Sequence, residues 1–267
     1  MSVQSLIIAC ELSLMLVGAV LAWRLVILPA IRKKPAPAQL PRWEISRTDF
    51  FLFVWFVIAG GFAGSLCAGL VLKFHPLGGD ATTMVGTAGG QLGGLIGIAL
   101  FEFFFDRRRP LETTRRPSVL VSGLVTFVIG LSAATLTNLL WQQLIQVFDL
   151  PGEKQDLVRM FLEAETPLLL GIMIVLACVG APATEELLFR RGIFRYVRTR
   201  LPRWAALLLP ACLFGAVHLN FAGYAPLVVL GLVFALAYER TGRIGTSMVA
   251  HALFNLNTIL LILAGIE

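Results

Sequence analysis

The chain has 267 residues, of which 57% are apolar and 14% are charged, and its mean hydropathy is +0.83. Water-soluble domains have roughly a quarter of their residues charged, so this composition excludes an ordinary soluble domain. The formal net charge of +6 would suit a nucleic-acid partner, but the basic residues are distributed as in a membrane protein.

Long apolar segments follow one another along the whole chain. A helix needs about 20 apolar residues to cross the hydrocarbon core of a bilayer, and helices satisfy their own backbone hydrogen bonds there. About eight segments meet this criterion, and they predict an all-α, polytopic transmembrane helix bundle surrounded by membrane lipids. Their expected limits are residues 5–30, 50–72, 84–105, 119–147, 167–189, 204–219, 224–238 and 244–264. The sixth and seventh are short. The first lacks a basic segment before it and a small-residue cleavage site after it, so we expect it to remain as an anchor.

Basic residues lie mainly in alternate connections between the predicted spans. Most of the 22 Lys and Arg residues fall within residues 32–47, 107–116, 190–203 and 240–243, whereas the other connections carry mainly Asp and Glu. The positive-inside rule predicts this alternation; it places the four basic connections in the cytoplasm and both termini outside. The Pro-rich segment 34–41 is expected to be a linker on the cytoplasmic side, because its prolines prevent a regular helix. The basic residues therefore indicate orientation in a membrane and no nucleic-acid partner.

The third span contains Gly86, Gly90 and Gly94 at intervals of four residues, interleaved with glycines at positions 89, 93 and 97. Glycines that bind phosphate lie in a turn between a strand and a helix, whereas these lie within an apolar helix. Small residues at this spacing let two membrane helices approach closely. We therefore expect this helix to pack closely against a neighbouring span.

Two adjacent carboxylates, Glu185 and Glu186, stand near the end of the fifth span, and Arg190 follows. A charged side chain at the centre of a span costs about 3 kcal/mol on insertion scales, so it marks a function or a specific pairing. Residues four apart share a helix face, so Arg190 can pair with Glu186. A salt bridge that closes the helix at the interface would explain Glu186 but would leave Glu185 unexplained.

Two of the three histidines, His218 and His251, lie in apolar spans, and Asn255 follows His251 by one turn. Either histidine alone would more often be a hydrogen-bonded packing residue, but both occur with two carboxylates. A carboxylate and an imidazole that share one water form a general base. A second histidine and an amide can donate hydrogen bonds to a developing oxyanion. Two Glu and two His are also a possible zinc set, although not in the His-Glu-x-x-His arrangement. Both alternatives lead to hydrolysis of a carbonyl bond within the membrane.

Three short motifs follow in order on successive predicted helices: Glu185-Glu186-x-x-x-Arg190, Phe214-x-x-x-His218 and His251-x-x-x-Asn255. Together they resemble the CPBP family of CAAX prenyl proteases and bacteriocin-processing enzymes, also called abortive-infection-like intramembrane proteases. The stretch Tyr238-Glu239-Arg240-Thr241-Gly242 resembles the family's approach to its last motif. The resemblance covers residues 165–257, about a third of the chain.

The resemblance implies roles for the six residues of these motifs. Glu185 and His218 would activate the attacking water, and His251 and Asn255 would stabilise the tetrahedral oxyanion. Glu186 and Arg190 would support the site as a pair. Both a metalloprotease mechanism and a metal-free glutamate/histidine mechanism are argued for the family, so the resemblance leaves open whether zinc is a cofactor.

We therefore expect N-terminal spans of unassigned role in residues 1–165 and a CPBP-like catalytic core in residues 166–267. The expected function is that of an intramembrane endopeptidase in a bacterial cytoplasmic (inner) membrane, acting on a membrane-associated protein or peptide, including a lipidated one. Two alternatives remain at this point: a non-enzymatic immunity or chaperone-like membrane protein on the same fold, and a proton or metal-ion transporter. The expected depths conflict for one residue, because His218 comes late in a span that runs outward whereas Glu185 and His251 lie toward the cytoplasm. They can converge only if the sixth span begins deeper or if the short spans do not fully cross.

Overall fold

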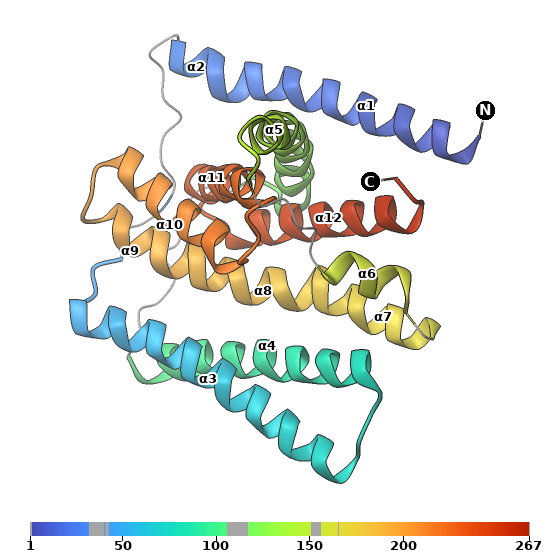
Figure 1. The fold of residues 1–267 in the computed structure, drawn as a ribbon. Helices are drawn as coiled ribbons and strands as arrows, with labels where there is room; N and C mark the ends of the chain where they lie inside the picture. Colours follow the sequence, from blue (N-terminus) through green and yellow to red (C-terminus); the bar gives the residue numbers. More distant parts are fainter. Residues whose placement is uncertain are drawn as a thin grey trace.

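The computed structural model describes residues 2–31, 40, 43–105, 117–150, 156–164 and 166–266. Every regular element in this part of the chain is a helix (Figure 1). Among the described helices, seven are long and apolar enough to cross a membrane. The protein is thus an all-α, multi-pass integral membrane protein, as the composition predicts. The basic connection 107–116 and most of the connection 32–47, including the predicted linker 34–41 except for Leu40, lie outside the described residues.

The N-terminal half forms two helix pairs. α1 packs mainly against α5, and α3 packs against α4, while α5 also contacts α11 and α12 of the C-terminal half. The elements of the N-terminal half are α1 (Val3–Ala22), continued by η1 (Trp23–Ile27) and α2 (Leu28–Ile31), then α3 (Arg47–Phe74), α4 (Gly79–Phe104), α5 (Val119–Val147) and the short α6 (Asp156–Leu162). The apolar pattern does not predict α6, because its seven residues are too few to show a helical period.

The C-terminal half is built on one continuous helix of 32 residues, Pro167–Arg198. Two π-helical stretches within it flank the segment that carries Glu185 and Glu186, and such stretches are frequent at functional sites. Its parts are α7 (Pro167–Val175), η2 (Leu176–Gly180), α8 (Ala181–Glu186), η3 (Leu187–Phe194) and α9 (Arg195–Arg198); α10 (Arg203–Val217), α11 (Tyr224–Thr241) and α12 (Ile244–Leu263) follow.

Local chemistry fixes several of the helix ends. A Ser or Thr side chain precedes α1, α3, α5 and α7, and its oxygen accepts a hydrogen bond from a backbone N–H of the first turn. Such caps satisfy donors that a helix start otherwise leaves free. At the other end of α11, Gly242 has a φ of 62°, a left-handed conformation that suits glycine and ends the helix. The chain therefore turns directly from α11 into α12.

The fifth predicted span was expected to end at Phe189, and this limit is wrong, since the helix continues to Arg198. The basic residues that mark a loop in the sequence instead pair with carboxylates on other helices. Arg191 Nη2 lies 2.9 Å from Glu102 Oε1, and Arg198 Nε lies 2.8 Å from Glu239 Oε1. Because these partners are distant in the chain, local sequence does not reveal them.

α10, the sixth predicted span, has 15 residues. At 1.5 Å per residue it is about 22 Å long, which is less than the roughly 30 Å of the hydrocarbon core. It therefore does not cross the membrane by its own length. Its end carries His218, and the loop that follows is held by α5: Trp141 Nε1 donates to Phe221 O at 2.9 Å and Gln142 Nε2 donates to Ala222 O at 3.1 Å.

α3 and α4 pack backbone against backbone through glycines. A Cβ atom on Gly93 would overlap the carbonyl oxygen of Gly60, and one on Gly64 would overlap that of Gly89. The prediction that the glycine-rich third span packs closely is confirmed. The tight contacts run along the interleaved glycines, whereas a Cβ on Gly86 would meet no atom within 4 Å.

Gly93→Ala is expected to lower the free energy of unfolding by about 1–3 kcal/mol, because the added methyl group must push two backbones apart. Gly86→Ala is the matched control, and it should be neutral or slightly stabilising, since alanine favours the helix. The midpoint of thermal unfolding of each purified variant in detergent measures the difference. Equal midpoints for the two variants would contradict the close packing.

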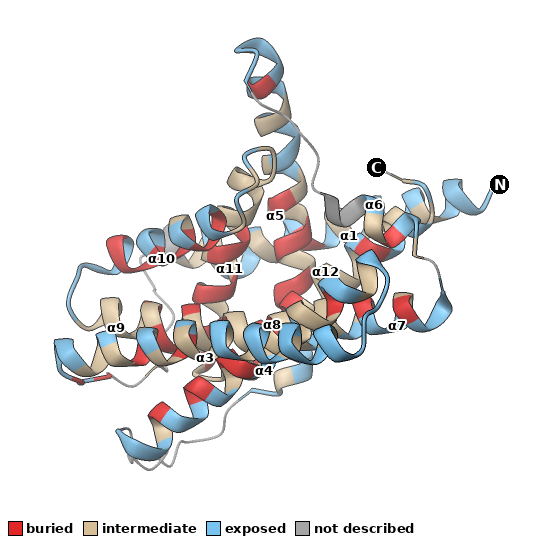
Figure 2. Cartoon of the chain, turned by 60° about the horizontal axis from the view of Figure 1, so that its bottom comes forward, coloured by how far each residue is buried: buried red, intermediate tan, exposed pale blue. Residues whose placement is uncertain are grey.

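Buried residues gather where α5, α8, α11 and α12 meet, whereas the outer helices are mainly exposed (Figure 2). The exposed residues of the outer helices are themselves large and apolar, for example Leu12, Phe62 and Leu139. Such a surface suits lipid rather than water. The polar residues with a candidate function lie on α8, η3 and α12 and at the C-terminal end of α10, beside this buried region.

Candidate active site

Glu186 is the centre of a buried polar cluster. Its Oε1 atom accepts hydrogen bonds from Arg190 Nη1 at 2.8 Å and from His251 Nδ1 at 2.9 Å. The Glu186 side chain is 0% exposed and that of Arg190 is 2% exposed. The pair predicted from the spacing of four residues is confirmed, but it lies in the interior and does not close the helix at an interface.

Aromatic rings and a backbone carbonyl surround the Arg190 guanidinium. Its Cζ atom lies 4.3 Å from the centre of the Phe214 ring and 5.3 Å from that of Phe234, within the range of cation–π attraction. Its Nη2 atom also donates to Gly231 O at 3.4 Å. Arg190 thus joins the long helix to α10 and α11, and its position fixes the orientation of the Glu186 carboxylate.

The imidazole of His251 is held on two sides. Its ring stacks on Phe234 with centroids 5.3 Å apart, and its Nδ1 atom faces Glu186. A carboxylate oxygen accepts hydrogen bonds, so Nδ1 carries a proton. The other nitrogen, Nε2, lies 3.9 Å from Glu185 Oε2.

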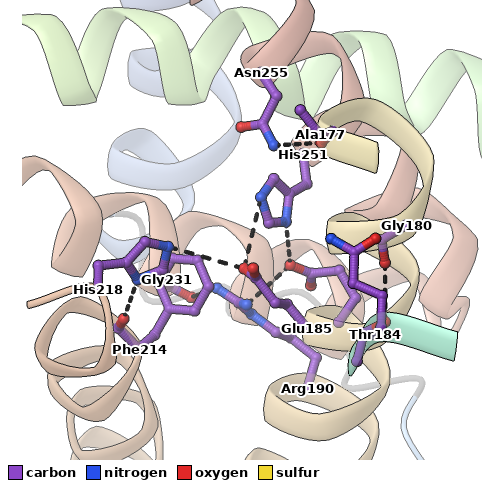
Figure 3. Close-up of polar contacts among 12 residues, drawn as sticks. Ala177, Gly180, Thr184, Glu185, Arg190, Phe214, His218, Gly231, His251 and Asn255 are labelled. Atoms are coloured by element: carbon purple, nitrogen blue, oxygen red, sulfur yellow. Dashed lines mark hydrogen bonds and ion pairs between the residues drawn. The ribbon is translucent and has the colours of Figure 1, made fainter. Parts of the chain in front are cut away.

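His218 approaches the same oxygen of Glu185 from α10 (Figure 3). Its Nδ1 atom lies 2.7 Å from Phe214 O, and a carbonyl oxygen only accepts, so Nδ1 is the donor. In the neutral ring Nε2 therefore carries a lone pair, and it lies 4.0 Å from Glu185 Oε2. Two acceptors at this distance cannot bond to each other, but one water between them can donate a proton to each.

Glu185 Oε2 is buried and has no hydrogen-bond partner among the described residues. The structure thus brings Glu185, His218 and His251 together, which removes the conflict over the depth of His218. Because α10 is short, its C-terminal end stops beside Glu185 rather than at the far surface.

Asn255 lies one turn beyond His251 on α12. Its Nδ2 atom donates to Ala177 O at 2.7 Å, so one of its two N–H groups is engaged with the π-helical stretch η2. Asn255 lines the same cavity as Glu185, His218 and His251. This cavity has a volume of about 590 Å³, within the range of roughly 300–1,000 Å³ that is typical of ligand sites.

Residues 167–257 match the family model described as "Type II CAAX prenyl endopeptidase Rce1-like". The matched segment contains all six residues of the predicted site. The match covers about a third of the chain. A stretch of 84 residues is also 31% identical to the Bacillus subtilis (strain 168) protein described as "Putative membrane peptidase YdiL". That stretch covers 32% of this chain and 34% of the relative, so the match spans about a third of the relative's length. No solved structure matches the chain.

The polar side chains of the matched segment do not form a zinc site. Among the described residues, no group of three or more His, Cys, Asp and Glu side chains is arranged to hold a metal ion. Glu186 Oε1 is already engaged by a guanidinium and an imidazole, and a cation beside Arg190 would be repelled. The donor set around Glu186 therefore does not fit a structural zinc site.

Gln91, a polar residue on α4 that belongs to none of the sequence motifs, also lines the cavity, outside the segment that the family model matches. Its Nε2 atom donates to Leu176 O at 3.4 Å, and a Cβ atom on Gly180 would overlap its Oε1. A polar side chain within a membrane span is energetically costly, and this criterion would also have identified Gln91. In the sequence, the glycines around Gln91 indicate helix packing instead.

Proposed function

We propose that the protein is an intramembrane endopeptidase, which hydrolyses a peptide bond of a membrane-associated protein or peptide in a bacterial inner membrane. The proposal rests on one observation above all: Glu185 Oε2 faces the Nε2 atoms of His218 and His251 at 4.0 and 3.9 Å in an apolar cavity within the membrane bundle. The family description names CAAX prenyl substrates, and a prenylated protein is one member of the lipidated class that the proposal includes.

In the proposed mechanism, a water between Glu185 and His218 loses a proton to this pair as its oxygen attacks the peptide carbonyl. The resulting oxyanion is stabilised by hydrogen bonds from His251 and from the free N–H of Asn255. His251 donates from Nε2 when both of its nitrogens carry protons, and Glu186 holds the other nitrogen. The C–N bond then breaks, and the captured proton passes to the leaving amine.

Comparison of protein termini in membranes tests the proposal directly. Cells that produce the wild type or Glu185→Gln at equal levels are compared by mass spectrometry of new N- and C-termini. We expect termini that occur only with the wild type, and these identify the substrate. Indistinguishable profiles from two folded proteins would instead favour the non-enzymatic alternative.

Trp141 is proposed to act on the reaction through the loop that follows His218. Trp141→Phe removes the hydrogen bond to Phe221 O but keeps a ring in contact with Phe221, whose centroid lies 5.3 Å away. We expect kcat to fall about tenfold, because a small shift of His218 disturbs the shared water, while KM changes little. Trp23→Phe, on the exposed N-terminal helix, is the control. An unchanged kcat, or a rise in KM alone, would contradict a positioning role.

A further inference from the structure

The cavity is an elongated chamber whose wall is formed by one face of each of several helices. On α4 the lining residues are Thr83, Met84, Thr87 and Gln91, and on the long helix they are Met173, Leu176, Ala177, Ala181 and Glu185. Positions at this spacing lie on one side of a helix. α4, α7 with α8, and α12 extend alongside one another (Figure 1), so their lining faces border a chamber that follows the helix axes.

Glu185 lies at one end of this chamber, and α6 covers the other. Glu185 is the last residue of the long helix that lines it, and His251 is the first on α12. At the opposite end, Met160 and Phe161 of α6 complete the lining, and Phe161 packs with Met84, Met173 and Ile259 in one buried cluster. The candidate catalytic residues thus lie at the bottom of a chamber that extends in one direction.

The length of the chamber limits how much of a peptide it holds. Met173 and Glu185 are twelve positions apart on one helix, which corresponds to about 18 Å at 1.5 Å per residue. An extended peptide advances about 3.5 Å per residue. A substrate that lies along the chamber with its scissile bond at Glu185 therefore places about five residues inside.

The lining is almost entirely uncharged. Apart from Glu185 and the two histidines, the described residues that line the chamber carry no ionisable side chain, and most are Met, Leu, Ile, Phe or Ala. The other polar groups, on Thr83, Thr87, Gln91, Asn255 and Thr258, can bond to a peptide backbone. A charged group in such surroundings loses its hydration without gaining an opposite charge. A second carboxylate would also be repelled by Glu185.

We propose that the chamber binds an uncharged, mainly apolar stretch of about five residues on one side of the scissile bond, so that cleavage occurs at an internal bond of a hydrophobic segment. This inference rests on the proposed function. A chain end carries a charge, so the enzyme does not cut where fewer than about five residues remain on the chamber side.

The test uses the purified full-length protein in detergent and a peptide library obtained by digesting a denatured proteome. Cut sites that require Glu185 are identified by mass spectrometry against Glu185→Gln. On one side of these sites, Asp, Glu, Lys and Arg are expected to be at least about tenfold under-represented over about five positions. Charged residues at the library frequency on both sides, or cuts next to a chain end on the depleted side, would overturn the inference while leaving the protease activity established. The absence of any Glu185-dependent cut would overturn the proposed function and the inference with it.

A second variant places a charge in the wall without changing the candidate catalytic residues. Thr87 is exposed on the chamber side of α4, so Thr87→Lys is compared with Thr87→Gln, a neutral chain of similar length. With Thr87→Lys, Asp or Glu is expected at one of the roughly five positions from which charged residues are otherwise missing. The frequency of Asp or Glu at that position of the cut sites should rise about fivefold or more. The same cut-site pattern for both variants would show that the substrate does not pass along α4 and would overturn the assignment of the chamber.

Discussion

Glu185→Gln and His218→Ala are each expected to lower kcat by about 10²–10⁴-fold, the usual contribution of general acid–base catalysis. The kcat of the double variant is expected to be only slightly below that of the less active single variant, because both side chains act on one water. Initial rates with purified variants and a peptide identified from the cut-site profile measure these losses.

The control for these rates is Glu11→Gln, which removes a carboxylate from α1, a helix that contributes no residue to the chamber lining. It should retain the wild-type rate. Losses that multiply in the double variant would mean that Glu185 and His218 serve separate steps. A single variant with near-normal kcat would remove that residue from the proposed mechanism.

Arg190→Met is expected to lower the free energy of unfolding by about 3–5 kcal/mol, because it leaves the Glu186 carboxylate buried without its cation. The double variant Glu186→Leu/Arg190→Met should recover most of this loss, since both charges are then gone. Thermal unfolding midpoints in detergent measure the stabilities.

Activity is expected not to recover with stability in that double variant. His251 Nδ1 donates to Glu186 Oε1, and leucine offers no acceptor, so the imidazole loses its fixed orientation. A double variant as unstable as Arg190→Met would indicate that lost packing against Phe214 and Phe234, rather than an unpaired charge, is the cause. A stable and fully active double variant would show that His251 needs no partner on the long helix.

The sequence predicts the membrane class and most of the spans because length and apolarity are local properties. It also predicts the six site residues, since charged or imidazole side chains within a span need a reason to be there. The sequence does not show that these residues meet in space, because this depends on where α10 ends and therefore on where His218 lies. The catalytic roles themselves remain proposals.

Other features depend on partners far apart in the chain and leave no local signal. The pairing of Arg191 with Glu102, and of Glu239 with Arg198 and Arg203, extends the fifth helix beyond its predicted end. The helix α6 is too short to show a helical period in the sequence. The Gln91 side chain occupies the space that a Cβ atom on Gly180 would need, and this contact arises only from tertiary packing.

The buried cluster around Glu186 also sets an order of events during synthesis. Glu186 and Arg190 are four residues apart on one helix, so the long helix can enter the bilayer with this charge pair already formed. His251 arrives only with α12, the last of the described helices, and the N-terminal part of a chain is made first. In the proposed mechanism, a nascent chain therefore holds the proposed general base before α12 brings His251, the proposed donor to the oxyanion.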